Sequence, residues 1–320
     1  MAAAGLLACA AAGGASANQP EVKAAVSLYQ RGEYLQASRA LSRVCPGSTD
    51  CGPARIWLGK SFLKLRRWSD AVDQMEEAVK TAPESGEAHL WLGRAYGMKA
   101  ANSFFLTALG LAKKVAKEFE TAIRLDPGNL DARFDLLEFC IEAPSMVGGG
   151  KDKAQFQAEA IARLNKRLGH TARAQIAEHD KQWQEAGDEL KQATETFPDD
   201  PGAFADLAGY LFKRGDYQRA ASASARALAL RPEYPAAQLT LAASEIRQRK
   251  DLQGAEAGLR GLAAGPLGDK DPTFEEVYYW LGEALLGQDK KTEARRAMQT
   301  ALKFNPDYKE ARSALSQLRP

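Results

Sequence analysis

Histidine is scarce in this sequence, and the histidines that are present form no metal-binding pattern. The 320 residues contain only His89, His170 and His179, and none stands at a metal-ligand spacing from a cysteine, aspartate or glutamate. The Gly-x-Ser-x-Gly motif of serine hydrolases is also missing. We therefore expect no catalytic residues, no metal and no cofactor, so that the chain is not an enzyme.

The sequence also lacks a strong charge of either sign and a long apolar run. Lysine and arginine number 43 against 41 acidic residues, and a net charge of +2 leaves no basic footprint for a nucleic-acid partner. Spanning a bilayer takes about 20 consecutive apolar residues, and no such run follows residue 20. We expect no transmembrane segment and no nucleic-acid partner. With 45% hydrophobic residues, a chain of this length can bury a large core.

The first 17 residues carry no charge and are mostly Ala, Gly and Leu, ending in Ala15-Ser16-Ala17. An apolar segment followed by a small-x-small cleavage site is typical of a secretory signal, although the positive n-region is missing. A second interpretation takes Leu6-Leu7-Ala8-Cys9 as resembling a bacterial lipobox, with Cys9 lipidated. A third is a disordered Ala/Gly tail. The first two predict a bacterial protein exported to the periplasm or associated with the outer membrane.

The sequence has four cysteines, and two of them are closely spaced. Cys45 and Cys51 bracket the turn-rich segment Pro46-Gly47-Ser48-Thr49-Asp50. Closing so short a loop would stabilise the fold by about 2 kcal/mol, and disulfides persist mainly in oxidising compartments. The alternative is two unpaired cysteines in a loop. Cys140 lies on an apolar helical face and is expected in the core.

Most of the chain repeats with a constant internal spacing. Three copies place an alanine 13 residues, and a proline 25 residues, after a leading leucine. The copies are Leu58, Ala71 and Pro83; Leu207, Ala220 and Pro232; and Leu281, Ala294 and Pro306. Apolar and small residues recur at helical intervals in each half, so each copy predicts two amphipathic helices ended by the proline. One such pair cannot bury its own apolar face, so the copies are expected to stack.

These positions resemble the tetratricopeptide repeat (TPR) family. The best copy has the residues Tyr278, Leu281, Gly282, Ala294, Met298, Ala301 and Pro306. The resemblance implies an all-α, right-handed α-solenoid of about eight stacked helix-turn-helix repeats over residues 18–320. A C-terminal capping helix is expected over residues 308–318. It also implies a protein–protein interaction scaffold whose partner is a protein or peptide.

One copy departs from the others in having glycine at its small positions. After Leu241 the expected spacing leads to Gly254, Gly258 and Gly261. Glycine weakens a helix interior by roughly 1 kcal/mol relative to alanine. The second helix of this copy is therefore expected to be the least stable.

Two neighbouring copies are stretched between their first and second helices. Leu92 to Pro127 spans 35 positions in place of 25, and Leu136 to Ala154 spans 18 in place of 13. The insertions lie near 97–106 and 143–150, and stacking would bring them to the same edge of the solenoid. Their apolar residues are Phe104, Phe105, Leu106 and Leu109 in the first and Pro144, Met146 and Val147 in the second. Either the two insertions pack on each other, or they present an apolar patch to a partner.

In the family, the first helix of each pair lines a concave groove. Carried over position by position, this places Lys60, Lys64 and Arg94 at its beginning, followed by Glu138 and Glu142. The apolar residues that follow are Phe212, Leu239, Ile246 and Tyr279. A groove that runs from basic through acidic to apolar can hold an extended peptide or a helix. The alternative is that these residues are ordinary solvated charges and packing residues.

A glycine-rich loop, Gly148-Gly149-Gly150-Lys151, precedes an expected helix and could bind an anion through its amides. Asp152 follows where a P-loop has Ser or Thr, so a flexible turn is the favoured interpretation. The run from Ala143 to Ala154 also resembles a segment of bacterial exported repeat proteins. The favoured function is a non-enzymatic scaffold of the bacterial envelope. The alternatives are an envelope-assembly component anchored through Cys9 and an enzyme accessory subunit with an anion site.

Overall fold

The computed structural model describes residues 20–45 and 51–318, and this part of the chain is almost wholly helical. It contains seventeen α-helices, one short 3-10 helix and no strand. The prediction of an all-α solenoid is therefore confirmed. The N-terminal segment with Cys9 lies outside the described residues, so the interpretations of it are not tested here.

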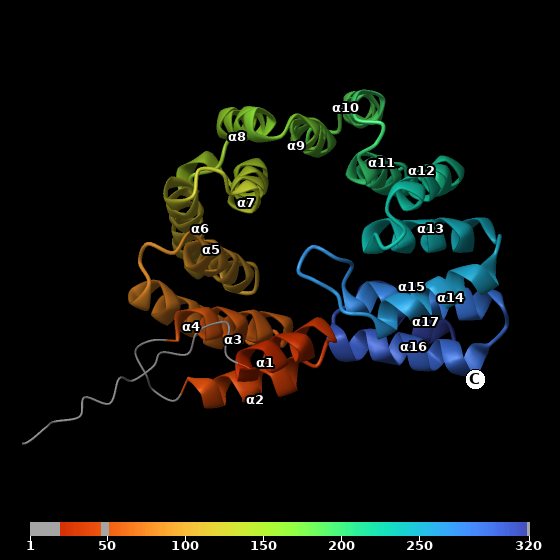
Figure 1. Ribbon diagram of the computed structural model, residues 1–320, viewed down its shortest axis with the longest axis horizontal. Coiled ribbons are helices and arrows are strands. Elements are labelled where there is room, and N and C mark those ends of the chain that lie inside the picture. Colours follow the sequence, from red (N-terminus) through yellow and green to blue (C-terminus); the bar gives the residue numbers. More distant parts are fainter. Residues whose placement is uncertain (1–19, 46–50, 319–320) are drawn as a thin grey trace, which may run out of the picture.

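Successive helices pair, and the pairs stack side by side around a central axis (Figure 1). The first four pairs are α1 (Pro20–Gln30) with α2 (Tyr34–Val44), α3 (Gly52–Lys64) with α4 (Trp68–Thr81), α5 (Gly86–Ala101) with α6 (Phe105–Leu125), and α7 (Leu130–Glu142) with α8 (Lys151–Leu164). The next four are α9 (Lys166–His179) with α10 (Trp183–Thr196), α11 (Pro201–Lys213) with α12 (Tyr217–Leu230), α13 (Pro235–Gln248) with α14 (Leu252–Ala264), and α15 (Phe274–Gly287) with α16 (Lys291–Phe304). A last helix, α17 (Lys309–Gln317), packs against α16.

Glycine in the first helix of a pair makes room for a large side chain of the second. A Cβ at Gly93 would lie 2.5 Å from the ring of Phe119, and one at Gly282 would lie 2.6 Å from Cε of Met298. Phe119 and Met298 are themselves buried core residues. The repeat spacing thus encodes a knob on one helix and a gap on the other, which holds the pair at close range.

Six of the eight pairs share the same tight turn, in which one residue has a left-handed backbone. These residues are Gly32, Arg66, Lys181, Gly215, Arg249 and Asp289, with φ between 52° and 79°. The two pairs without this turn are α5–α6 and α7–α8, which are the stretched copies. The insertions therefore replace a standard turn and leave the stacking of the pairs intact.

The first insertion is helical. α5 has 16 residues and α6 has 21, whereas α3 and α4 have 13 and 14, so the extra residues lengthen both helices and leave a short connection at 102–104. The expectation of a long solvent-facing connection is wrong at this place. A run with Ala, Leu and Lys has good helix propensity and continues the flanking helices. The second insertion forms the 3-10 helix η1 (Ser145–Val147) and a glycine turn.

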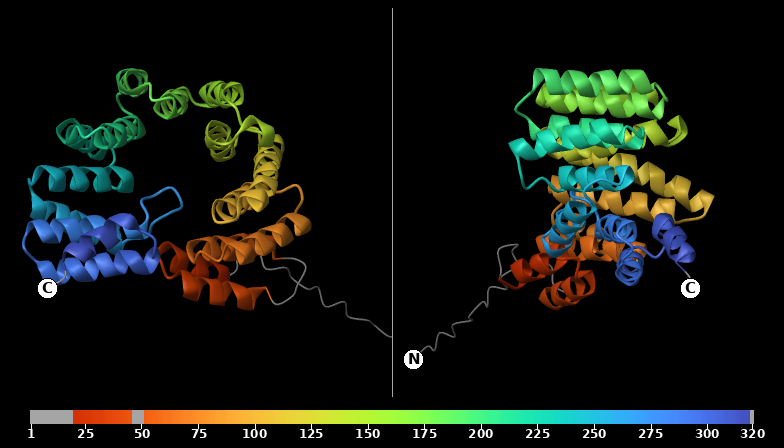
Figure 2. Two further views of the ribbon diagram at one scale, coloured as in Figure 1. Left: turned by 180° about the vertical axis from the view of Figure 1, so that it is seen from behind. Right: turned by 90° about the vertical axis from the view of Figure 1, so that its right-hand side faces the viewer.

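The stack curves until its last pair lies beside its first (Figures 1 and 2). A Cβ at Gly32, in the α1–α2 turn, would meet the rings of Phe274 and Phe304 at 2.9 Å. Tyr34 of α2 lies edge-on to Phe304, with ring centroids 6.1 Å apart. Arg66 donates to Asp307 at 2.7 Å. The solenoid therefore closes into a ring through contacts between residues more than 200 positions apart.

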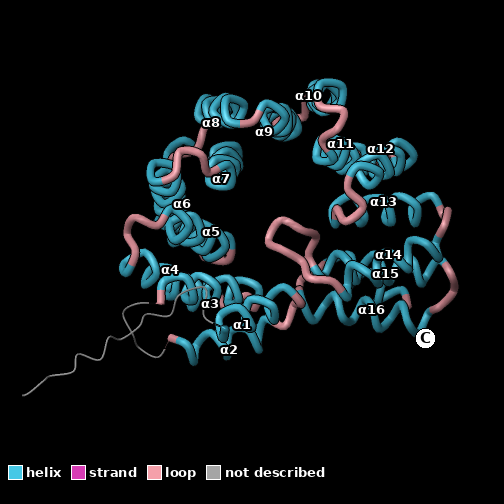
Figure 3. The backbone as a smooth tube through the Cα atoms, in the orientation of Figure 1, coloured by secondary structure: helices cyan, strands magenta, loops and turns pink. Residues whose placement is uncertain are grey.

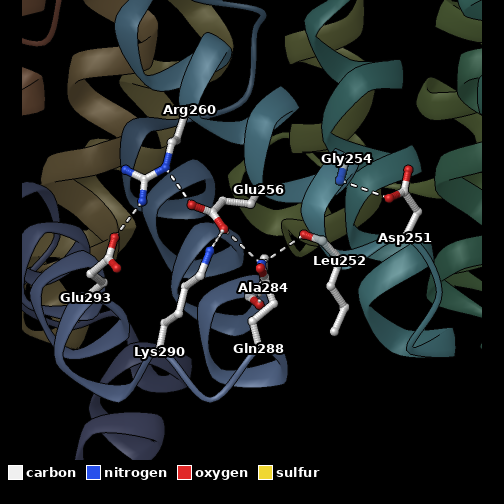
Figure 4. A network of polar contacts seen from close by, with 9 residues as sticks. All are labelled: Asp251, Leu252, Gly254, Glu256, Arg260, Ala284, Gln288, Lys290 and Glu293. Atoms are coloured by element: carbon white, nitrogen blue, oxygen red, sulfur yellow. Dashed lines mark hydrogen bonds and ion pairs between the residues drawn. The ribbon is translucent and has the colours of Figure 1, made fainter.

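The glycine-rich helix α14 is held to the next pair by a polar network centred on Glu256 (Figure 4). Its carboxylate accepts from Arg260 at 2.8 Å, Gln288 at 2.8 Å and Lys290 at 2.7 Å. The hydrogen bond from Lys290 is the main reason that the pKa of Glu256 is lowered to about 2. Arg260 also donates to Glu293, so α14 is joined to α16 as well as to the turn before it.

The packing face of α14 differs from the one that the repeat spacing predicted. Ala255 and Leu259 are buried, whereas Cβ atoms at Gly258 and Gly261 would meet nothing within 4 Å. The prediction that the glycines occupy the small packing positions is therefore wrong. Helix α13 has one residue more than α3, which moves the packing position from 254 to 255.

Because Gly258 and Gly261 lie on an open helical face, we expect alanine at both positions to stabilise the protein. Each substitution should raise the free energy of unfolding by about 0.5–1 kcal/mol, through helix propensity alone. Urea unfolding followed by circular dichroism measures the change. Gly93→Ala is the contrasting variant and should destabilise, since its Cβ would overlap the ring of Phe119. Destabilisation by the α14 substitutions would show that these glycines are packed.

Candidate functional site

The inner face of the ring is occupied in part by the closing loop, residues 265–273, which connects α14 to α15 and reaches toward the axis (Figure 3). Leu267 is buried, and its amide donates to the carbonyl of Gln30 at 2.8 Å. Asp269 accepts a hydrogen bond from the hydroxyl of Tyr29 at 2.7 Å. Lys270 pairs with Asp131 on α7 at 2.5 Å. The loop thus contacts both α1 and α7 across the inside of the ring.

Lys60 is the buried cation that receives this loop. Only 4% of its side chain is exposed, and its Nζ lies 2.6 Å from a carboxylate oxygen of Asp269. The same Nζ lies 3.4 Å from the ring centroid of Trp57 and 4.4 Å from that of Trp91. Burial lowers the pKa of Lys60, and Asp269 counteracts this shift. The aromatic rings and the loop carboxylate together compensate the desolvation of the ammonium group.

Beside Lys60 lies the central pocket, a cavity of about 590 Å³ on the concave face. Its lining residues come from α3, α5 and α7, with Asp269 of the closing loop at one side. The walls are aromatic and apolar, and include Trp68, Trp91, Met98 and Phe139. The polar groups are Lys60, Lys64, Arg94, Asp135, Glu138, Glu142 and Asp269. This combination of apolar walls and a few charged groups is typical of a ligand site.

The charges of the pocket are paired unevenly. Arg94 donates to Asp135 from Nε at 2.5 Å, and Lys60 is bound to Asp269, so two of the three cations are neutralised. Glu138 and Glu142 form no ion pair among the described residues. Burial raises the pKa of Glu138, as does repulsion by Glu142 and Asp135. The pocket therefore offers two free carboxylates to a ligand.

The acidic pair also borders a second hollow of about 410 Å³ further along the concave face. This hollow is lined by Ile141, Gln175, Glu178, His179 and Trp183 in addition to Glu138 and Glu142. The two cavities share the carboxylates of α7. An extended segment that occupied both would pass directly over them.

The structure brings together the first five groove residues named from the sequence and separates them from the rest. Lys60, Lys64, Arg94, Glu138 and Glu142 all line the central pocket. The apolar set instead supports packing: Ile246 and Tyr279 are buried, Leu239 packs against the C-terminal core, and Phe212 lies 5.5 Å from Trp280, centroid to centroid. Sequence position alone could not distinguish a groove residue from one that packs against the next repeat.

The stretched copies separate in a similar way. Phe104, Phe105 and Leu106 are 92%, 73% and 80% exposed, and Met146 is 74% exposed. Val147 is buried, so it holds the second insertion in place and offers no surface to a partner. A Cβ at Gly148 would lie 3.2 Å from Ala116, which shows that the second insertion packs on the shaft of α6. The expected mutual packing therefore extends to the shaft and not to the apolar residues 104–106.

The glycine-rich loop has its backbone amides already engaged. Gly148, Gly149 and Gly150 donate to the carbonyls of Ser145, Pro144 and Cys140 at 3.1, 3.2 and 2.8 Å. A Cβ at Gly149 would lie 1.8 Å from the carbonyl oxygen of Ala143, so only glycine fits this turn. These three amides cannot also bind an anion, and the loop acts as a tight connection.

The remaining candidates for chemistry have structural partners. His89 bonds Glu118 at 2.5 Å, and His170 bonds Glu189 at 2.7 Å. Among the described residues there is no group of three or more His, Cys, Asp or Glu side chains placed to hold a metal ion. In the same part of the chain, no helix is long and apolar enough to cross a membrane. Cys45 and Cys51 are joined as a disulfide, with Cα atoms 6.0 Å apart, and Cys140 is buried.

Sequence reasoning missed Asp269 and the closing loop, although a signal was present. Leu241 and Leu281 are 40 residues apart, whereas undisturbed neighbouring copies are 34 apart, as in Leu58 to Leu92. The extra residues fall between two repeats and not within one. A search for stretched copies does not detect them.

Asp269→Ala should lower the free energy of unfolding by about 3 kcal/mol, because it leaves Lys60 charged, buried and unpaired. Chemical denaturation monitored by tryptophan fluorescence measures this loss. Lys270→Ala in the same loop is the matched control and should cost at most about 1 kcal/mol, since the side chain is 75% exposed. Equal effects of the two variants would mean that the buried ion pair does not hold the ring closed.

Comparison with known families identifies the repeat. A sequence profile described as Tetratricopeptide repeat matches residues 58–96, and a second profile of the same description matches residues 275–308. Both matches cover positions of the recurring pattern, from Leu58 in the first and from Leu281 to Pro306 in the second. No curated protein sequence matches this chain.

Solved structures share the fold at low sequence identity. Yeast Tom70 has a TM-score of 0.62 at 14% identity, over 95% of this chain and 64% of that chain. A monomeric IFIT1 mutant with Gppp-AAAA has a TM-score of 0.52 at 14% identity, over 93% of this chain and 70% of that chain. The APC/C hetero-tetramer Cut9–Hcn1 gives 0.50 at 16% identity, over 94% of this chain and 55% of that chain.

The chain spans less than two thirds of the chains matched in Tom70 and Cut9–Hcn1. At these identities the likeness concerns the fold alone. The repeat spacing, the stacked helix pairs and the two family matches agree: the chain is a tetratricopeptide repeat protein.

Proposed function

We propose that this protein is a non-enzymatic scaffold of the bacterial envelope that binds an extended segment of a protein partner on its concave face. The tetratricopeptide fold is a scaffold for protein–protein interaction. The finer proposal concerns which surface is used and what it recognises. It assigns binding to the central pocket and the hollow that continues it.

The free carboxylates of Glu138 and Glu142 carry the proposal. They lie on α7 at the junction of the two cavities, next to aromatic and apolar walls. A partner segment with a lysine or arginine would place its cation at these carboxylates and its apolar neighbours against Trp68 and Phe139. A charge-assisted hydrogen bond at this junction would fix the register of the segment.

The disulfide supports the proposed location. Cys45 and Cys51 are paired in the structure, and disulfides persist mainly in oxidising compartments such as the periplasm. The segment with Ala15-Ser16-Ala17 is the proposed export signal. The alternative within the same location is a component anchored to the outer membrane through lipidated Cys9.

Mass spectrometry of the protein expressed in a Gram-negative host and recovered from its envelope separates these two forms. A free signal peptide predicts a mature chain that begins at Asn18, with no acyl group. A mature chain that begins at an acylated Cys9 would establish the anchored form. An uncleaved chain recovered from the cytosol would contradict both.

The binding proposal is tested with peptides selected from a random display library on the wild-type protein. The selected peptides should be enriched in a basic residue next to an apolar one. Fluorescence anisotropy should then show at least about a tenfold loss of affinity for Glu138→Lys with Glu142→Lys, because charge reversal repels the peptide cation. The matched control is Glu159→Lys with Glu195→Lys, on the second helices α8 and α10, which should bind normally.

The pH dependence provides a second readout of the same interaction. Since the pKa of Glu138 is raised above its usual 4.5, its charge is lost at a higher pH than that of an ordinary glutamate. Affinity should therefore fall as the pH is lowered toward about 5, and Glu138→Gln should reduce this dependence. Selected peptides without basic residues, or equal losses in the control variant, would contradict the proposal.

A further inference from the structure

The end of the α5–α6 hairpin exposes a concentrated apolar group that the central pocket does not use. Phe104, Phe105 and Leu106, here called the hairpin tip, have 92%, 73% and 80% of their surface exposed. They are consecutive and stand where α6 begins, so their side chains fan out around the end of the hairpin. Each is a side chain that proteins usually bury, and three adjacent ones left in solvent are costly without a binding role.

The hairpin that carries this tip has charge of one sign only. Between Met98 and Lys117 there are four lysines and no aspartate, glutamate or arginine. The lysines are Lys99, Lys113, Lys114 and Lys117. Lys113 and Lys117 are exposed and make no ion pair among the described residues, while Lys114 lies 4.0 Å from Glu76. A chain that is almost neutral overall thus concentrates positive charge behind an apolar tip.

The shape of the hairpin argues against a protein interface. The hairpin extends past the neighbouring pairs at one edge of the ring (Figure 2, right). The second insertion packs near Ala116, eleven residues along α6 from Phe105, and so does not broaden the tip. A stable protein interface buries about 800 Å² on each partner, more than three convex side chains provide. A fluid partner can surround a convex tip on all sides.

We propose that the hairpin tip inserts into the surface of a lipid bilayer that carries anionic headgroups. Phenylalanine and leucine enter the boundary between headgroups and acyl chains, and the lysines remain at the level of the headgroups. Lys113 stands eight residues after Phe105, about 12 Å along the helix at 1.5 Å per residue. Its flexible side chain reaches back toward the surface, where the negative potential is strongest.

This arrangement would hold the ring by one edge and leave the concave face open to a partner. The tip lies on the connection between α5 and α6, whereas the central pocket is lined by the inner helices α3, α5 and α7. Membrane attachment through the tip is therefore independent of peptide binding, and each can fail without the other.

Co-sedimentation with vesicles tests the inference on the full chain. Wild-type protein should sediment with phosphatidylcholine vesicles that contain about one third phosphatidylglycerol, and at least about tenfold less with pure phosphatidylcholine. Phe105→Asp should reduce binding to the anionic vesicles at least about tenfold, because an aspartate cannot enter the acyl boundary. Lys113→Glu should reduce it several-fold and weaken its dependence on salt.

Two matched variants show whether the effect belongs to the tip. Phe156→Asp changes another exposed phenylalanine, 58% accessible on α8, and Lys250→Glu reverses an exposed lysine at the α13–α14 turn. Both should sediment like the wild type. Circular dichroism and thermal unfolding of every variant should match the wild type, since none of these side chains is buried.

Three outcomes would overturn the proposal. The first is a wild-type protein that does not bind anionic vesicles. The second is equal loss of binding in Phe105→Asp and Phe156→Asp. The third is a dimer of the wild type that Phe105→Asp converts to a monomer in the absence of lipid. This last result would assign the tip to contact with a second copy of the chain.

Discussion

The closed form of this solenoid depends on one buried ion pair. Lys60 has almost no solvent contact, and its charge is compensated by Asp269 and by the rings of Trp57 and Trp91. A charge held in this way is tolerated only when its partner is in place, because an uncompensated buried ammonium group is strongly destabilising. The carboxylate comes from a loop 209 positions further along the chain. The ion pair therefore links the first repeats to the last ones.

The same contact determines the character of the concave face. If the loop lay elsewhere, Lys60 would join Lys64 and Arg94 as a basic surface. With Asp269 bound to Lys60 and Asp135 bound to Arg94, the free charges that dominate the pocket are the carboxylates of Glu138 and Glu142. An intramolecular contact thus changes a groove that looks basic in sequence into one suited to a cationic segment. Ring closure and ligand choice have a common origin.

The repeat pattern was sufficient to predict the helix pairs and five residues of the pocket. Their predictability has a simple reason: Leu, Gly and Ala at fixed spacing define which helical face packs within a pair, and the opposite face of the first helix is then the groove. The register of α14 was not predictable, because one added residue in α13 shifts the packing face onto Ala255. Tyr279 and Phe212 were also misplaced, since their burial depends on neighbours in adjacent repeats and not on their own position.

The sequence by itself determined the repeat, the pairing of the helices and the position of both insertions, because these follow from short-range spacing. Only the tertiary structure decided that Val147 is buried while Phe104 is exposed, since both are apolar residues in an insertion. It alone brought Asp269 to Lys60, which depends on the small rotation between successive pairs accumulated around the whole ring. Curvature of that kind is the sum of many contacts, and no local pattern in the sequence records it.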